Sequence, residues 1–173
     1  MDQLIDKLNN CTKDKDAYEA VFLNNLPNRD RYERWLTFYP EHYARNCVVR
    51  TDSYELIMIC WEKDQKTLIH DHDSKEGWVA VLEGELSDKR YVKPTEGETL
   101  IEIDNIDVSA GEVSYINDEI GLHQLANNHE GRTVSLHLYV PPIDSCGTYD
   151  LSGTKETIEL EYHSLNPDGI PEN

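Results

Sequence analysis

From about residue 44 onward, the chain consists of short segments rich in apolar and β-branched residues, separated by turn-forming residues. Residues 134–140 are the clearest of them, because their apolar and polar members alternate with the period of two that a β-strand requires. Further segments of this kind are residues 54–61, 78–82, 91–92, 100–103 and 112–116. Many short strands with turn signals between them predict a β-sandwich or barrel, so the chain should be mainly β.

The region before these segments has a different pattern. Residues 1 to about 42 contain apolar positions at helical spacing, as at Tyr18, Val21 and Phe22, and the pattern continues over residues 28–35. We therefore expect N-terminal α-helices that pack on one side of the β-structure.

The length of 173 residues suits one domain with a proper core, so we expect residues 1–173 to form a single domain. Its β-barrel should span about residues 43–162, with a last strand within residues 158–162. About residues 163–173 are polar and contain two prolines, and we expect them to form a flexible tail.

The formal net charge of −18 limits the possible partners. Such a surface repels phosphate backbones and anionic lipids, so we expect no binding to nucleic acid. No segment approaches the ~20 apolar residues of a membrane span, and the acidic N-terminus does not resemble a signal peptide. The four cysteines are widely spaced. We expect a cytoplasmic protein with free thiols and no contact with a membrane.

Two histidines one residue apart are the strongest sign of function. His70 and His72 lie in an expected strand, where side chains at positions i and i+2 point to the same face. Two imidazoles can thus converge on a metal, and His123 is a candidate for a third ligand. Three neutral imidazoles suit zinc, copper, iron or nickel, so the spacing alone leaves the metal open. Three other histidines have no such context, and we expect them at the surface: His42, His129 and His163.

The spacing around these histidines resembles the two motifs of the cupin family, whose fold is a jelly-roll β-barrel. Gly77 and Gly84 follow the histidine pair at the distances of the first motif, and His123 occupies the histidine position of the second. The cupin resemblance brings His123 to the metal, and Gly77 stands where the first motif normally has a glutamate ligand. Glu76 is adjacent, but on a strand it would face away from the metal. A site with three neutral histidines keeps the full charge of the ion and favours anionic ligands such as a thiolate.

With these residues in view, the chain resembles the cysteine dioxygenases, the thiol dioxygenase branch of the cupins. The resemblance runs from about Tyr43 to Asp150. The matching strings are Tyr43-Ala44-Arg45-Asn46, Cys60-Trp61, Ile69-His70-Asp71-His72, Tyr115-Ile116-Asn117-Asp118, Ile120-Gly121-Leu122-His123 and Ser135-Leu136-His137-Leu138-Tyr139-Val140-Pro141-Pro142.

The resemblance implies that Fe(II) is held by His70, His72 and His123. It implies that L-cysteine binds the iron through its thiolate and amine, and that both atoms of O2 reach the sulfur to give cysteine sulfinate, a step in cysteine catabolism and sulfur metabolism. Arg45 matches the residue that pairs with the substrate carboxylate, and its planar fork of donors suits that partner. Family members are usually monomers.

Further roles follow from the same resemblance. Tyr43 and Trp61 are expected to bind substrate or support the pocket. Ser135, His137 and Tyr139 alternate on one strand and match a relay in which Tyr139 points its hydroxyl at the substrate or oxygen. We reject a serine hydrolase, because no acid partner or nucleophile elbow is found and the serine lies in a regular strand.

Two further positions bear on the resemblance. Animal members carry a cysteine that is cross-linked to the tyrosine matching Tyr139, and this chain has Gly77 there, so we expect no cross-link. Cys146 matches a cysteine near the mouth of the pocket, where we expect a structural role. The family often has a cis peptide bond before the first proline of Val140-Pro141-Pro142.

Three other functions remain open. The nearest is a dioxygenase for another small thiol such as 3-mercaptopropionate, whose enzymes typically have glutamine in place of Arg45. The second is a non-catalytic cupin that binds a metal or small ligand, which would not need a poised Tyr139. The third is a cupin that uses zinc or nickel in isomerase chemistry.

Overall fold

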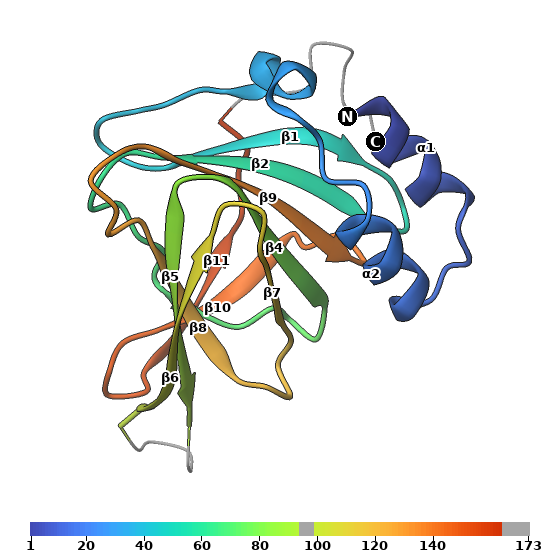
Figure 1. Ribbon diagram of the computed structural model, residues 1–173. Coiled ribbons are helices and arrows are strands. Elements are labelled where there is room, and N and C mark those ends of the chain that lie inside the picture. The colour runs from blue at the N-terminus through green and yellow to red at the C-terminus, as the bar shows by residue number, and fades with distance from the viewer. Residues whose placement is uncertain (94–98, 164–173) are drawn as a thin grey trace.

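The computed structural model, which describes residues 1–93 and 99–163, is mainly β with two N-terminal α-helices (Figure 1). The helices are α1 (Asp2–Asn10) and α2 (Lys15–Leu23), followed by two 3-10 turns, Arg29–Arg31 and Glu33–Trp35. The strands are β1 (Ala44–Arg50), β2 (Glu55–Trp61), β3 (Ile69–His70), β4 (Glu76–Glu83), β5 (Glu85–Val92), β6 (Ile101–Ser109), β7 (Val113–Ile116), β8 (Leu122–Ala126), β9 (Thr133–Val140), β10 (Ser145–Tyr149) and β11 (Lys155–Glu159). The predicted class, mainly β with N-terminal helices, is confirmed.

The strands form two sheets. One has five strands in the order β1-β2-β9-β4-β7, and the other has six in the order β11-β10-β3-β8-β5-β6. Every pairing between these strands is antiparallel. The chain passes repeatedly from one sheet to the other, for example between β4 and β5 and between β8 and β9, as in a jelly roll.

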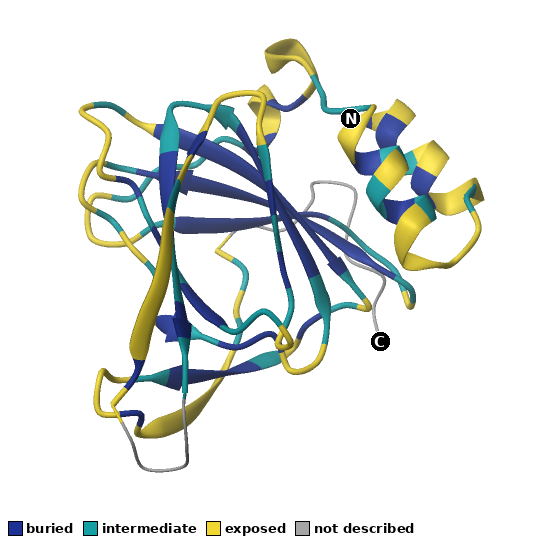
Figure 2. Ribbon diagram, turned by 60° about the horizontal axis from the view of Figure 1, so that its bottom comes forward, coloured by how far each residue is buried: buried dark blue, intermediate teal, exposed yellow. Residues whose placement is uncertain are grey.

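The five-stranded sheet is buried on both faces (Figure 2), because helices cover its outer face and the second sheet covers its inner face. Alternation assigns the side chains of β9 to these faces. Leu136 and Leu138 belong to the cluster that also contains Leu4 and Phe22 of the helices. Tyr139 belongs to the cluster between the sheets. This alternation places the polar residues of β9 in the interior, where a site can form.

The segment expected to be helical at residues 28–35 forms two 3-10 turns instead of an α-helix. Its backbone bonds span three residues, from Arg31 N to Asn28 O and from Trp35 N to Tyr32 O. Residues three apart lie on the same side of a 3-10 turn. Tyr32 and Trp35 are therefore both directed into the core, where each is 2% exposed.

The C-terminal part differs from the expectation in its limits. The last strand is β11 at Lys155–Glu159, where residues 158–162 were expected, because β11 pairs in register with β10 and ends where β10 begins. The expected tail falls largely on residues 164–173, which lie outside the described residues, whereas His163 is described. Within the described part of the chain, no helix is long and apolar enough to span a membrane.

Candidate functional site

Three histidine side chains converge between the two sheets. His70, at the end of β3, pairs directly with His123 on β8, and His72 follows two residues later. One potential ligand atom from each histidine can be chosen so that all three lie within 4.8 Å of one another. The structure thus brings together the three histidines that the sequence indicated, as a group that could hold a metal ion.

His72 is not on the same strand as His70, contrary to the expectation from their spacing. The strand β3 ends at His70. The backbone then turns, with positive φ at Asp73 and Ser74, and the Asp118 carboxylate accepts hydrogen bonds of 2.7 Å from the amides of His72 and Ser74. His72 thus reaches the site through a loop held by Asp118.

The protons on two of these rings can be assigned from their partners. The Nδ1 atom of His70 lies 2.9 Å from the carbonyl oxygen of Leu68, and that of His123 lies 2.9 Å from a carboxylate oxygen of Asp88. Both partners only accept hydrogen bonds, so each Nδ1 carries the hydrogen and each Nε2 carries a lone pair.

The two Nε2 atoms lie 3.2 Å apart, and their lone pairs cannot hydrogen-bond to each other. Two nitrogens bound to one ion at about 2.1 Å, with an angle of about 90–110° between the bonds, would be about 3.0–3.4 Å apart. The separation of the His70 and His123 nitrogens is therefore what a shared cation requires.

His72 is the third member of the group. Its two ring nitrogens are buried and have no hydrogen-bond partner among the described residues, which is costly unless a ligand satisfies them. Burial and the neighbouring His123 lower the pKa of His70 to about 3 and that of His72 well below its ordinary value. Both rings are thus uncharged at neutral pH, the form that binds a metal.

Asp88 on β5 supports His123 from behind. Its side chain is fully buried, and it also accepts a 2.6 Å hydrogen bond from Ser114, while Arg90 lies 3.4 Å away. Burial alone would raise the pKa of Asp88, but the hydrogen bond from His123, together with Ser114 and Arg90, lowers it to about 2. The carboxylate is ionised, so His123 donates to a negative charge and becomes a more basic ligand.

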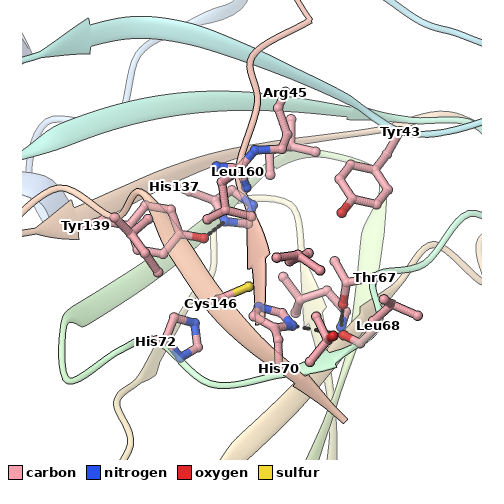
Figure 3. Close-up of a pocket in the computed structure, with 15 residues that line it drawn as sticks. Tyr43, Arg45, Thr67, Leu68, His70, His72, His137, Tyr139, Cys146 and Leu160 are labelled. Carbon is pink, nitrogen blue, oxygen red and sulfur yellow. Dashed lines mark hydrogen bonds between the residues drawn. The ribbon is translucent and has the colours of Figure 1, made fainter. Parts of the chain in front are cut away.

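A pocket opens over the histidines, and its opposite wall comes from the five-stranded sheet. Figure 3 shows Arg45, His137 and Tyr139 facing His70 and His72 across this pocket. The apolar or weakly polar part of the lining comprises Ile59, Leu68, Leu125, Ile143, Cys146, Ile158 and Leu160.

Arg45 is 8% exposed, and its Nε and Nη2 atoms are buried without a hydrogen-bond partner in residues 1–93 and 99–163. An unpaired guanidinium in a pocket is costly to desolvate, and a bound carboxylate would satisfy it with two parallel hydrogen bonds. Tyr43 lies beside it in the same wall.

Trp61 lies behind the wall of the pocket. It is fully buried and is not among the described residues that line the cavity. Its ring packs on that of Tyr43 with centroids 4.8 Å apart, and its Nε1 donates a 2.9 Å hydrogen bond to Ser135. Trp61 therefore supports Tyr43 and the serine.

Ser135, His137 and Tyr139 form a hydrogen-bonded chain along β9. The Ser135 hydroxyl lies 2.8 Å from His137 Nε2, and His137 Nδ1 lies 3.2 Å from the Tyr139 hydroxyl. Because Ser135 accepts from Trp61, its own hydrogen can go to Nε2, which leaves a hydrogen on Nδ1 for the Tyr139 oxygen. Burial lowers the pKa of His137 and raises that of Tyr139, so both are uncharged at neutral pH. The Tyr139 hydrogen is then free to point into the pocket.

The structure places both Gly77, which stands at the usual glutamate position of the first motif, and the adjacent Glu76. The Glu76 carboxylate accepts a hydrogen bond from Tyr115, and Glu76 is outside the group of potential metal ligands. A Cβ atom at Gly77 would lie 3.4 Å from Cε1 of Tyr139 and 3.5 Å from Cδ2 of His72. Gly77 thus faces the tyrosine and the histidine group. The Val140-Pro141 peptide bond is cis.

Sequence reasoning missed two residues that hold the site in place. Asp118 occurs in one of the strings that carried the family resemblance, but its hydrogen bonds to the His72 loop depend on a contact 46 residues away. Asp88 is an acidic residue in a strand whose neighbour Leu86 is fully buried. A carboxylate two residues after Leu86, and so on the same face as this apolar residue if the segment is a strand, was the signal that could have found it.

Comparisons with known proteins agree with this geometry. Residues 2–152 match the family model described as "Cysteine dioxygenase type I". Cysteine dioxygenase type 1 from Rattus norvegicus is 30% identical over 153 residues, which cover 86% of this chain and 73% of the rat protein. The Homo sapiens protein of the same name is 32% identical over 126 residues, covering 70% of this chain and 63% of the human one.

Solved structures also resemble the fold. An uncharacterized conserved protein with a double-stranded β-helix domain from Klebsiella pneumoniae superposes with a TM-score of 0.53 at 12% identity, over 75% of this chain and 93% of that one. A protein from Thermus thermophilus gives 0.52 at 17% identity, over 63% and 92%. The predicted cupin fold is thereby confirmed.

Proposed function

The chain belongs to the type I cysteine dioxygenase family, and we propose that it uses Fe(II) to add both atoms of O2 to the thiol of L-cysteine, giving L-cysteine sulfinate. Membership makes it an oxidoreductase that acts as a thiol dioxygenase. The observation that carries the proposed substrate is the guanidinium of Arg45, whose buried Nε and Nη2 lack a partner among the described residues and which faces His70 and His72 across the pocket.

The proposed ligands of the iron are His70, His72 and His123. Their support is the pair of opposed Nε2 lone pairs and the unpartnered ring of His72. When bound, Fe(II) supplies the redox chemistry that lets O2 react with a thiolate, and three protein ligands leave positions for both. With no carboxylate among the ligands, the site keeps a charge that attracts an anionic sulfur.

Arg45 is proposed to bind the substrate carboxylate. Its guanidinium presents planar donors, and the carboxylate of an amino acid can accept two of them at once. The thiol and the amine of cysteine would then be directed toward the histidine group. Holding the reacting sulfur in one place can lower the activation barrier substantially, so binding at Arg45 also serves the reaction.

Tyr139 is proposed to donate a hydrogen bond to the reacting sulfur or oxygen. The order of donors from Trp61 through Ser135 and His137 leaves the Tyr139 hydrogen unused within the chain. An oriented donor at the reaction centre stabilises negative charge that develops there. Because residue 77 is glycine, we propose that this tyrosine works without a thioether bond.

The nearest rival is a dioxygenase for a thiol such as 3-mercaptopropionate. That substrate also has a carboxylate but lacks the amine, so a carboxylate-binding Arg45 is compatible with both thiols. Only the match of Arg45 to the cysteine dioxygenases favours cysteine. We propose cysteine as the substrate, and a monomeric, cytoplasmic enzyme with four free thiols.

A competition assay tests the choice of substrate. Fe(II)-loaded protein is given O2 and equal amounts of L-cysteine and 3-mercaptopropionate, and each sulfinate is measured by mass spectrometry. We expect cysteine sulfinate to dominate, whereas an excess of 3-sulfinopropionate would contradict the assignment.

The role of Arg45 is tested with Arg45→Gln, which should raise KM for cysteine about 10- to 100-fold, because a charge-assisted pair is lost. The exposed Arg29→Gln serves as the matched control. An unchanged KM for Arg45→Gln would refute the carboxylate role.

A further inference from the structure

The strand that carries Arg45 lies at an edge of its sheet. β1 is the first strand in the order β1-β2-β9-β4-β7, so only β2 pairs with it along its length. The outer side of an edge strand leaves peptide groups without strand partners. A residue there is held less firmly than one in the middle of a sheet, unless another segment satisfies its backbone.

His163 provides that partner for Arg45. The amide of Arg45 donates a 3.0 Å hydrogen bond to Nδ1 of His163, and the amide of His163 donates a 2.8 Å hydrogen bond to the carbonyl oxygen of Arg45. One residue thus fixes both peptide groups of Arg45 from a position 118 residues later in the chain. The sequence alone predicts only an ordinary surface histidine at this position.

The imidazole of His163 is itself held in place. It stacks on the ring of His42, with centroids 4.6 Å apart and an angle of 27° between the planes, and Tyr39 lies 5.9 Å away. The preceding Tyr162 donates a hydrogen bond to Glu55 and accepts one from Arg50. These contacts hold the pair of hydrogen bonds between His163 and Arg45, here called the clamp, although His163 itself is exposed.

The same segment reaches the pocket. Leu160 lines the cavity, and its amide donates a 2.8 Å hydrogen bond to the carbonyl oxygen of Asp144. Figure 3 shows Leu160 beside Arg45 on the same side of the cavity. Residues 160–163, here called the C-terminal strap, thus run from the pocket to the edge of β1.

We propose that His163 is a positioning residue that sets the affinity of the enzyme for the carboxylate of its substrate, by fixing the backbone of Arg45. This inference rests on the proposed function. A guanidinium can form two hydrogen bonds with a carboxylate only if its base does not shift, and an edge strand without the clamp can shift. Among the described residues, the hydrogen bonds and ring contacts of His163 are to Arg45, His42 and Tyr39, and none is to the three-histidine group, so its effect should fall on substrate binding.

The hydrogen bond from Arg45 requires an uncharged His163, because a protonated Nδ1 cannot accept. The groups facing the ring are His42, Arg45 and Glu161, together with the aromatic ring of Tyr39. Burial, followed by the charges of His42 and Arg45, lowers the pKa of His163, and Glu161 opposes them. The clamp is intact at neutral pH and opens on acidification, so KM for cysteine should rise at acid pH through this residue.

Two variants at one position test the inference. His163→Ala removes the acceptor, and the loss of one hydrogen bond should raise KM for cysteine about 3- to 10-fold while kcat stays within about twofold. His163→Asn keeps an acceptor oxygen near the position of Nδ1 and cannot be protonated. This variant should restore KM for cysteine to the wild-type value. It should also remove the part of the rise in KM at acid pH that comes from protonation of His163. His129→Asn, at an exposed histidine in the loop between β8 and β9, is the control.

The inhibition constant of cysteamine gives the decisive comparison, because cysteamine keeps the thiol and amine of cysteine and has no carboxylate. His163→Ala should leave this constant unchanged. An unchanged KM for cysteine, or an equal loss of affinity for cysteine and cysteamine, would overturn the inference. If the wild-type protein makes no cysteine sulfinate, the proposed function fails; if Arg45→Gln raises KM and His163→Ala does not, only the role of His163 fails.

Discussion

Replacing Asp88 with asparagine tests how the protein tunes its metal site. The carboxylate of Asp88 is fully buried and accepts the Nδ1 hydrogen of His123 at 2.9 Å. An asparagine has the same shape and can still accept that hydrogen, so Asp88→Asn removes the charge and keeps the geometry. The variant should bind Fe(II) more weakly, because a neutral amide makes His123 a less basic ligand.

The expected size of the effect can be worked from the pKa of Asp88, which falls from 3.8 to about 2. This lowering means that the folded protein favours the ionised form over the protonated one by about 2 kcal/mol. Because this pKa is lowered, the stabilisation is present above pH 3.8 and is lost as the pH falls toward about 2. Losses of metal affinity for such supporting residues are typically about 10- to 100-fold, and we expect Asp88→Asn to fall in this range because the ionised carboxylate is the form that supports His123.

The assay is a competition for Fe(II) between the protein and a chelator under anaerobic conditions. The matched control is Asp107→Asn, which removes the same charge from an exposed position on the neighbouring strand β6. We expect Asp88→Asn to lose about 10- to 100-fold in affinity and the control to lose less than about twofold. Equal affinities for the two variants would refute the reasoning that the carboxylate acts through His123.

Three other outcomes follow from the geometry. Tyr139→Phe should lower kcat about 100-fold or more and leave the affinity for Fe(II) unchanged. The control Tyr115→Phe, at a tyrosine outside the pocket, should retain the wild-type kcat. A wild-type kcat for Tyr139→Phe would exclude Tyr139 from the mechanism. The metal-free protein should lose stability as the pH falls below about 6.5, because the unfolded chain binds protons at His70 and His72 that the folded chain does not. Urea titrations at several pH values would show this as a falling midpoint, and a constant midpoint would contradict it. Gly77→Cys places a thiol beside the Tyr139 ring. If turnover with O2 joins the two in a thioether bond, the protein should become lighter by two hydrogens in intact-mass analysis. An unchanged mass after many turnovers would show that the sulfur cannot reach the ring.

Features that depend on short-range periodicity could be predicted from the sequence. The alternation in residues 134–140 placed Ser135, His137 and Tyr139 on one face, and the structure joins them by hydrogen bonds. The number of short apolar segments indicated a mainly β fold. In each case the relevant spacing is local, because a strand repeats every two residues.

Features that depend on long-range contacts could not be predicted from the sequence. The path of the chain at His72 is set by Asp118, and the support of Ser135 by Trp61 depends on the register between β2 and β9. The clamp on Arg45 joins residues 118 positions apart at the edge of a sheet. No local pattern specifies which segment covers an edge strand, so His163 resembled any exposed histidine.

We propose that this three-histidine site transfers both atoms of O2 to the sulfur of cysteine. The most direct measurement is a turnover of Fe(II)-loaded protein with L-cysteine under ¹⁸O₂, followed by mass spectrometry of the product. We predict cysteine sulfinate that carries two labelled oxygen atoms per molecule. A sulfinate with one labelled atom, or cystine as the sole product, would contradict the account.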